Sequence, residues 1–232
     1  YRAAPGWITD VDIRRVHVDG RGSRTANSIA LMGAVRDVTL HDITVRGGYT
    51  GVAVHWGAVG AGVASIGGPT YHPNRLSIHD LRVSDAVEGF YLSSVHDVRV
   101  TGACLHDVEM GFRLLPGDNT DRFHHDPDAH IGDRIEISDV CVRWTGDRYG
   151  VRVAGWGRSE VDGLISTLDY RDTVIRDCVV HRVPPPADPA RRSAAAWSPV
   201  LLERADGVAL HNVRVGSGAD AGCSRAASLR SW

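Results

Sequence analysis

The chain has 232 residues, of which 43% are apolar, and its formal net charge at pH 7 is −2. This length and apolar content fit one domain with a long core, while the balanced charge excludes the basic excess typical of nucleic-acid-binding proteins. No apolar run is long enough to cross a bilayer, so we expect neither nucleic acid nor membrane as a partner.

Short strands recur along the chain. In each of them apolar residues alternate with other residues, and this period of two is typical of β-strands rather than helices. The pattern apolar-x-apolar-x-polar-apolar-x-apolar, with small variations, occupies residues 11–18, 38–45 and 76–83, a stretch beginning at Val98, and residues 135–142, 173–180 and 208–215.

A second motif, Gly-apolar-x-apolar, follows three of these segments at a constant distance. It occupies Gly51–Val54, Gly89–Leu92 and Gly111–Leu114, and the last two copies begin 22 residues apart. A pattern that returns at such a period indicates a solenoid, in which each repeat stacks on its neighbours. We therefore predict an all-β fold, a parallel β-solenoid of about seven coils.

Insertions separate the Gly-headed motif from the next paired strands. They fall at residues 56–74, 116–134 and 155–172. Solenoids tolerate insertions at such points, and the loops often gather on the binding face. We expect residues 1–232 to form a single domain, with residues 216–232 as a C-terminal tail or cap.

One position inside the paired-strand pattern is nearly always polar. We expect it to form the corner between two strands, because Asp and Asn accept unusual backbone dihedrals and bond to nearby backbone groups. This structural role explains these residues better than catalysis does. The position is occupied by Arg15, Asp42, Asp80, Gly102, Asp139, Asp177 and Asn212 in successive coils.

The chain contains four cysteines. Cys104 and Cys141 occupy equivalent outward positions on adjacent coils, roughly 4.8 Å apart, so we predict that they can form a disulfide. Cys178 points inward by the same alternation and is expected to be a small core residue. Cys223 falls in the tail, where the pattern assigns it no role.

These motifs resemble the coils of the right-handed parallel β-helix proteins of the pectin-lyase-like superfamily. The resemblance covers nearly the whole chain and implies that the Gly-headed strands line a substrate cleft walled by the long loops. It also implies action on polysaccharides as a lyase, hydrolase or epimerase, or a tailspike-like role. Val18–Gly22 and Asn119–Asp121 are similar to segments of polygalacturonase-like hydrolases, although the other signatures of those enzymes are missing.

Alternation predicts two outward columns on the Gly-headed strands. The first contains Ala30, Ala53, Tyr91, Arg113, Arg152 and Leu201, and the second contains Met32, His55, Ser93, Leu115, Ala154 and Glu203. Arg113 and Arg152 would thus lie one strand apart, about 4.8 Å between backbones. Two like charges at that distance repel each other, so something negative must offset them.

Two explanations of this arginine pair remain open. Nearby acids can offset the charge, and the candidates are Glu88, Glu109, Asp118 and Asp147. Alternatively, the pair binds a carboxylate or sulfate of an acidic sugar, which suits the fork of a guanidinium. Tyr91 and His55 would then be the proton-transfer groups of an elimination reaction.

The loop after Arg113 concentrates acids and histidines. Asp118, Asp121, His124 and Asp126 could hold a divalent metal such as Ca²⁺, or supply the acid and base of a hydrolase. A solvated polar loop explains the composition equally well, since no standard ligand spacing is present.

Aromatic and histidine side chains stand at the rims of the long loops. Flat rings beside polar groups are a usual platform for sugar faces, although the same rings could simply hold the loops down. The candidate substrate-binding residues are Trp56, Tyr71, His72, Trp156 and Trp197.

We predict a carbohydrate-active protein, in the first place a lyase that acts on an acidic, uronate-containing polysaccharide. The alternatives are a glycoside hydrolase that uses loop carboxylates and a non-catalytic, tailspike-like glycan-binding solenoid, which would fit a homo-oligomer. The chain starts at Tyr1 without a visible signal sequence. We expect it to be a processed piece of a longer, secreted protein.

Overall fold

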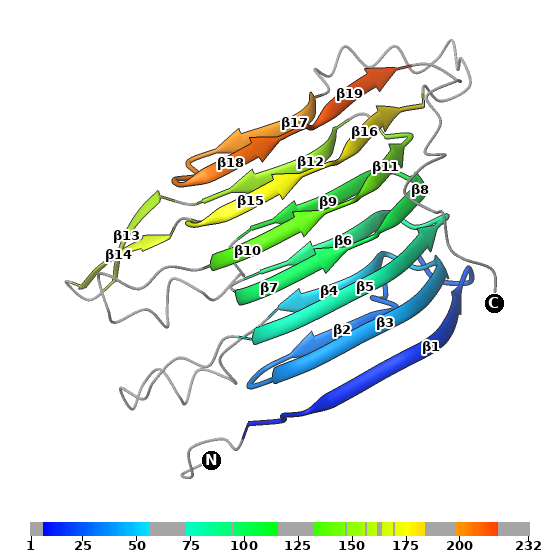
Figure 1. The fold of residues 1–232 in the computed structure, drawn as a ribbon, viewed down its shortest axis with the longest axis horizontal. Helices are drawn as coiled ribbons and strands as arrows, with labels where there is room; N and C mark the ends of the chain where they lie inside the picture. Colours follow the sequence, from blue (N-terminus) through cyan, green and yellow to red (C-terminus); the bar gives the residue numbers. More distant parts are fainter. Residues whose placement is uncertain are drawn as a thin grey trace.

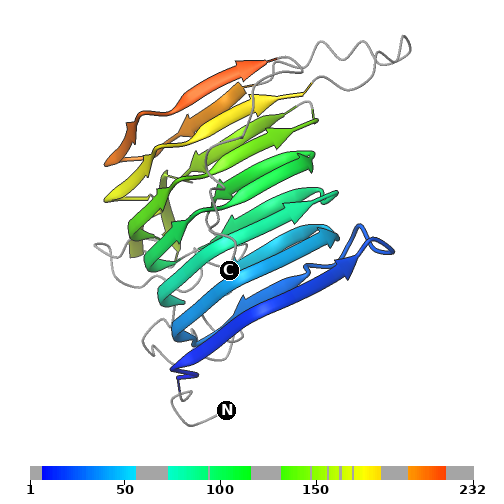
Figure 2. The ribbon, with the colours of Figure 1, turned by 45° about the vertical axis from the view of Figure 1, so that its right-hand side comes forward.

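The protein is described by a computed structural model that covers residues 7–55, 73–93, 95–115, 132–146, 148–155, 157–161, 164–168, 170–183 and 198–217. In these ranges the chain forms strands and no helix. Figures 1 and 2 show the strands stacked in chain order, from the blue β1 to the orange β19. The predicted all-β solenoid is confirmed.

Most strands belong to two parallel sheets, which we call the long sheet and the short sheet. The long sheet has eleven strands: β1 (Val11–Gly20), β3 (Arg36–Gly47), β5 (Asn74–Ser84), β7 (His96–Thr101), β8 (Cys104–Val108), β10 (Asp133–Ser138), β11 (Cys141–Trp144), β15 (Thr173–Arg176), β16 (Val179–Arg182), β18 (Val208–His211) and β19 (Arg214–Ser217). The short sheet has six: β2 (Ile29–Met32), β4 (Thr50–His55), β6 (Glu88–Leu92), β9 (Met110–Leu114), β12 (Tyr149–Ala154) and β17 (Ser198–Glu203).

The chain alternates between the two sheets, which makes it a parallel β-helix. As far as β17, each passage through the long sheet, such as β3 or β7 with β8, is followed by one strand of the short sheet, such as β4 or β9. Parallel pairing then places every strand directly on its equivalent in the next coil. Residues at matching points of the repeat therefore form straight rows along the solenoid.

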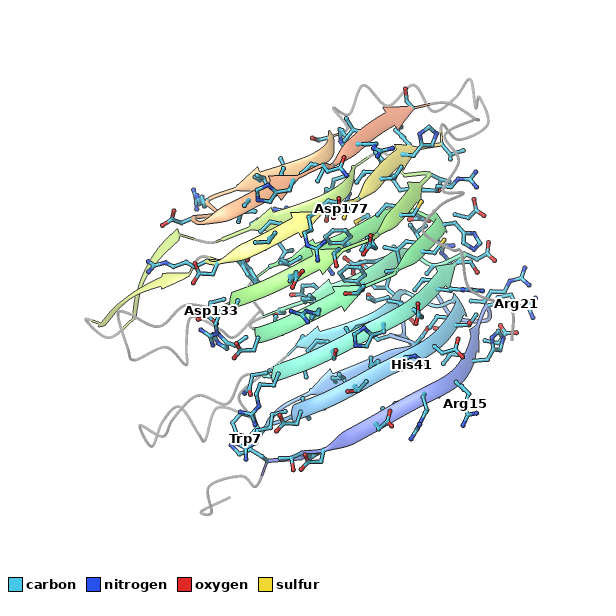
Figure 3. All side chains as sticks on the ribbon, viewed as in Figure 1. Trp7, Arg15, Arg21, His41, Asp133 and Asp177 are labelled. Carbon is cyan, nitrogen blue, oxygen red and sulfur yellow. The ribbon has the colours of Figure 1, made fainter. Side chains whose placement is uncertain are left out.

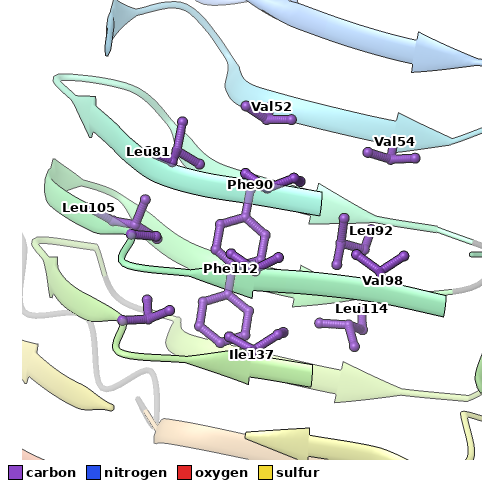
Figure 4. Close-up of a cluster of buried hydrophobic side chains, with 14 of the residues drawn as sticks. Val52, Val54, Leu81, Phe90, Leu92, Val98, Leu105, Phe112, Leu114 and Ile137 are labelled. Carbon is purple, nitrogen blue, oxygen red and sulfur yellow. The ribbon is translucent and has the colours of Figure 1, made fainter. Parts of the chain in front are cut away.

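The core lies between the two sheets. One inward row of the short sheet runs through Val52, Phe90, Phe112 and Val151, all of them buried. The rings of Phe90 and Phe112 are stacked, with centroids 4.5 Å apart (Figure 4). Because each such side chain contributes about 1.5–3 kcal/mol when removed from water, these rows supply much of the folding free energy.

Four strands of the short sheet, β4, β6, β9 and β12, have a glycine at their second position that no larger residue could replace without a steric clash. A Cβ on Gly111 would come within 2.1 Å of the Gly150 carbonyl oxygen and 2.4 Å of a Val142 methyl group, and Gly89 is equally crowded. The missing side chain therefore points inward, like that of the next residue in the strand. Two successive positions, the glycine and the residue after it, thus face the core, which breaks the alternation of inward and outward side chains. The residue before the glycine lies on the outer face.

Left-handed backbone forms the corners of the long sheet, inside the continuous strands β1, β3 and β5 and between the two strands of each later coil. At the predicted position the six non-glycine residues have φ between 48° and 55°, and Gly102 has φ 72°. Arg15 and Asp177 mark this corner in Figure 3. Asn212 Nδ2 also donates a hydrogen bond to Asp177 Oδ1 in the neighbouring coil at 2.8 Å, so the structural role predicted for this position is confirmed.

A second corner of the same kind, five residues earlier in each coil, was not predicted. Its positive-φ residues alternate in charge along part of the stack, through Asp37, Arg75, Asp97 and Arg134. Arg75 donates to Asp37 at 2.5 and 2.6 Å, and Arg134 donates to Asp97 at 2.5 and 2.9 Å. The alternation of apolar residues did not predict this corner, because it falls at the start of the strand and no alternating apolar residues precede it.

The predicted disulfide between Cys104 and Cys141 is wrong. The two residues are paired in register, as expected, but Cys104 is a free cysteine. Cys141 is itself disulfide-bonded, but to a partner other than Cys104, so register within the stack did not decide the pairing. Cys178 is buried in the core, as predicted.

The insertion after β12 contains more order than expected. Residues Gly157–Val161 (β13) and Leu164–Leu168 (β14) form an antiparallel hairpin beside the stack of coils (Figure 1). The sequence between them, Asp162-Gly163, is a strong signal for a two-residue hairpin turn. That dipeptide could have identified the hairpin.

Candidate functional site

The outer face of the short sheet carries the predicted column of side chains. Tyr91 pairs with Arg113, and Arg113 pairs with Arg152, on three consecutive strands. Ala30 and Ala53 precede them, and Leu201 follows. The predicted register is confirmed at every position of this column, since each position follows from the alternation of inward and outward residues along its strand.

Much of this face is shielded from solvent although its side chains point away from the core. Ala53, Ser93 and Ala154 are buried, as are Thr50 and Glu88 in the row before the glycines. Polar groups on such a surface lose most of their contact with water. They must satisfy one another, and their electrostatic interactions are stronger than on an open sheet.

Arg113 is held between an aromatic ring and a buried carboxylate. Its Nε atom forms an ion pair with Glu88, whose side chain is 0% exposed, while that of Arg113 is 22% exposed. The guanidinium carbon lies 4.2 Å from the centre of the Tyr91 ring, a distance suited to a cation–π contact. Thr50 Oγ1 donates a hydrogen bond of 3.0 Å to the other oxygen of Glu88.

The charge states of this pair depend on each other. Burial raises the pKa of the Glu88 carboxyl, and the contacts with Arg113 and Thr50 oppose that rise. Burial is the largest single influence on Arg113 and would lower its pKa, but the charge and hydrogen bond of Glu88 together with Tyr91 and Tyr149 outweigh it, so the pKa of Arg113 lies above its ordinary value. Removing either partner would leave the other poorly solvated.

His55 lies beside Tyr91. Their ring centres are 6.0 Å apart, and the rings are tilted by 34°. Asn27 Nδ2 lies 3.4 Å from His55 Nε2. The structure thus brings together an imidazole, a phenol and a guanidinium, groups that can transfer protons and stabilise a negative charge.

Arg152 has different partners from Arg113. Its Nε and Nη2 atoms lie 2.9 and 2.8 Å from the same oxygen, Oε2 of Glu203. The guanidinium carbon is 5.6 Å from the centre of the Tyr149 ring. Burial lowers the pKa of Arg152, but Tyr149 and Glu203 outweigh that effect and raise it above its ordinary value.

The predicted offset of the arginine charges by acids is therefore right in part. Glu88 was among the expected partners, whereas Glu109 pairs with Arg24 instead. Glu203, the partner of Arg152, was not foreseen, because counting along the strand gives the column of a side chain but not the reach of its rotamer. Thr50, Tyr149 and Asn27 were also missed. The position before the glycine of each motif could have indicated Thr50 and Tyr149.

Several predicted site residues lie outside the described part of the chain. They are Asp118, Asp121, His124 and Asp126 of the acidic loop, Asp147, and Trp56, Tyr71, His72, Trp156 and Trp197. Within the described residues, no group of three or more His, Cys, Asp or Glu side chains is arranged to hold a metal ion. The metal site in the acidic loop stays a prediction. The same residues include no helix with the length and apolar character of a membrane span.

Comparison with known proteins adds a distant structural likeness. No protein-family model matches the chain, and no curated protein matches it in sequence. Among solved structures, the A-module of a mannuronan C-5 epimerase from Azotobacter vinelandii is similar, with a TM-score of 0.47 and 11% sequence identity. The match covers 91% of this chain and 56% of the epimerase module.

Proposed function

We propose that this protein binds an acidic polysaccharide along the outer face of the short sheet and cleaves it by β-elimination at a uronate residue. One observation carries the proposal: Tyr91, Arg113 and Arg152 stand in one row on consecutive strands, with the His55 ring 6.0 Å from that of Tyr91. The residues for binding an acidic sugar and for moving its proton are thus adjacent.

The reaction needs a proton to leave carbon 5 of the sugar, next to the carboxylate. That carboxylate must be neutralised first, because its charge opposes a second negative charge on the neighbouring carbon. A guanidinium is suited to this task, since it binds both carboxylate oxygens and stays protonated. Arg152 would bind the group.

Tyr91 and His55 would carry the protons. One of them removes the proton from carbon 5, and the electrons of that C–H bond form the double bond between carbons 4 and 5. The bond from carbon 4 to the glycosidic oxygen breaks, and the second group donates a proton to the departing oxygen. The shielding of this face supports the mechanism, because charges that develop during the reaction are stabilised more strongly there than in water.

A non-catalytic glycan-binding protein is the second candidate. It is favoured by the observation that both arginines already have carboxylate partners within the chain, Glu88 and Glu203. A row of neutralised charges beside aromatic rings could bind a sugar without activating it. The hydrolase alternative relies on loop acids outside the described residues, and no described contact supports it.

The assay is incubation with polygalacturonate and polymannuronate in heavy water. A lyase produces ultraviolet absorbance from unsaturated ends, and deuterium entering carbon 5 without cleavage reports proton abstraction alone. We expect Tyr91→Phe and His55→Ala to reduce the rate by about 100-fold or more, as loss of a general acid or base does. Arg99→Ala on the exposed long sheet is the matched control for Arg152→Ala and should be active.

Reducing ends without absorbance would point to a hydrolase. Binding that persists with neither absorbance nor deuterium exchange would favour the glycan-binding protein. If Tyr91→Phe, His55→Ala and Arg152→Ala all retained full activity, the proposed site would be wrong.

A further inference from the structure

We infer that the two arginines of the row have different tasks: Arg113 is a fixed part of the site, whereas Arg152 binds the ligand carboxylate in exchange for Glu203. Glu203 would thus act as an internal competitor that only an anionic sugar displaces. This inference rests on the proposed binding of acidic polysaccharide to the same face. The two ion pairs carry it, because they differ in burial and in geometry.

The pair of Arg113 and Glu88 is not exchangeable. Glu88 is 0% exposed, and its second oxygen accepts a hydrogen bond from the buried Thr50. A ligand that took Arg113 away would leave a buried carboxylate without its cation, which is a strongly unfavourable state. The Tyr91 ring, 4.2 Å from the guanidinium carbon, restricts Arg113 further.

The pair of Arg152 and Glu203 is exposed. The two side chains are 31% and 44% exposed, and ion pairs in contact with water contribute little to stability. A displaced Glu203 could be hydrated at once, because it lies in β17 at the end of the short sheet. Exchanging this partner is therefore easy.

The contact between Arg152 and Glu203 is not the arrangement that a guanidinium and a carboxylate prefer, so a ligand carboxylate could bind Arg152 better. Both Nε and Nη2 contact a single oxygen of Glu203, at 2.9 and 2.8 Å. The preferred arrangement of a guanidinium and a carboxylate uses two parallel hydrogen bonds to two different oxygens. A sugar carboxylate that approaches from the solvent side can adopt this arrangement. A neutral sugar offers no charge to replace that of Glu203, so the exchange selects uronates.

The test is equilibrium binding of the whole protein to oligogalacturonate and oligomannuronate, with fully methyl-esterified oligogalacturonate as the neutral probe. Glu203→Gln should bind the charged oligomers about two- to fivefold more tightly, in line with the small strength of an exposed ion pair. It should not change binding of the esterified oligomer. In the background of Arg152→Ala the effect of Glu203→Gln should vanish.

The matched control is Glu136→Gln. Glu136 accepts hydrogen bonds from Arg99 and Arg176 on the long sheet, so this variant also removes one carboxylate from an arginine pair and changes the net charge equally. It should leave affinity unchanged. Equal tightening in both variants would show a general charge effect and overturn the inference.

Other outcomes separate this inference from the proposed function. If the parent protein binds uronate oligomers and Arg152→Ala abolishes binding, but Glu203→Gln changes nothing, then the exchange is wrong and the proposed function stands. If neither the parent nor Glu203→Gln binds any uronate oligomer, both fail. Binding by Glu203→Gln alone would support the exchange strongly. Thermal unfolding of each variant verifies that it is folded.

Discussion

The outer faces of the two sheets are built on the same backbone and have opposite characters. On the long sheet several outward side chains are open to water: Arg99, for example, is 64% exposed and pairs with Glu136. On the short sheet Glu88 and Thr50 also face outward, yet both are buried. On both faces, parallel stacking determines which residues are neighbours. How much their interactions contribute to stability depends on their exposure to solvent.

This difference separates the charges of the long sheet from those of the proposed site. The charged rows of the long sheet are neutralised step by step along the stack, by pairs such as Arg75 with Asp37 and Arg134 with Asp97. Exposed pairs of this kind contribute little each. The short sheet has fewer charges, but they are partly dehydrated and stand beside Tyr91 and His55. Desolvated charges beside proton-transfer groups are a typical feature of functional sites.

The largest effect should come from the close stacking of the glycines that head strands of the short sheet. Gly111→Ala would place a methyl group 2.1 Å from a backbone oxygen. We expect a loss of more than about 4 kcal/mol in the free energy of unfolding, or no folded protein. Gly22→Ala is the control, because a Cβ at Gly22 has no atom within 4 Å. Urea denaturation measures both, and a stable Gly111→Ala variant would contradict the close stacking.

Removing the buried carboxylate of the short sheet should have the next largest effect. Glu88→Ala leaves Arg113 without its partner on a shielded face, so we expect a loss of about 3 kcal/mol. The same change at Glu136, which is only partly buried, should lower stability by less than about 1 kcal/mol. Equal losses in urea denaturation would show that the two faces do not differ in solvation.

The corners of the long sheet should show a smaller effect that depends on backbone alone. Asp42 has a φ of 55°. Asp42→Ala should cost about 1 kcal/mol, because a left-handed conformation is unfavourable for alanine, and Asp42→Gly should cost less. Chemical denaturation of both variants tests this order. A glycine variant less stable than the alanine variant would contradict it.

The smallest effect concerns acid stability of the long sheet. The hydrogen bonds from Arg134 hold the pKa of Asp97 below its ordinary value of 3.8. For Asp133, burial acts in the opposite direction, but His96 and Arg134 outweigh it and lower the pKa. Because the folded state favours the ionised carboxylates, their stabilisation is complete above the ordinary pKa and is lost as the pH falls through the lowered values.

Asp97→Asn should therefore reduce the loss of stability on acidification, measured by urea denaturation from neutral pH to about pH 2. Asp12→Asn, on β1 of the same sheet and paired with Arg14 instead, serves as the control. An Asp97→Asn profile that runs parallel to that of the parent protein at every pH would show that this pair does not contribute to acid sensitivity.

Much of the fold, and the row of outward side chains in the proposed site, could be predicted from residue spacing. The period of two and the recurring glycine were enough to place Tyr91, Arg113 and Arg152 in one row, because register in a parallel stack follows from counting. The corner residues could be predicted for the same reason. The contact between Glu88 and Arg113 could not be predicted in this way. It depends on a break in alternation at Gly89, and the packing of Gly89 is decided by the neighbouring coil.

By itself, therefore, the sequence determined which residues share a row and which face the core, because both follow from local periodicity. The tertiary structure decided which outward groups lose contact with water and which carboxylate each arginine takes. Those outcomes separate Arg113, beside a Glu88 that is 0% exposed, from Arg152, beside a Glu203 that is 44% exposed. Solvation and side-chain reach depend on atoms from several coils at once, and no single stretch of chain contains them.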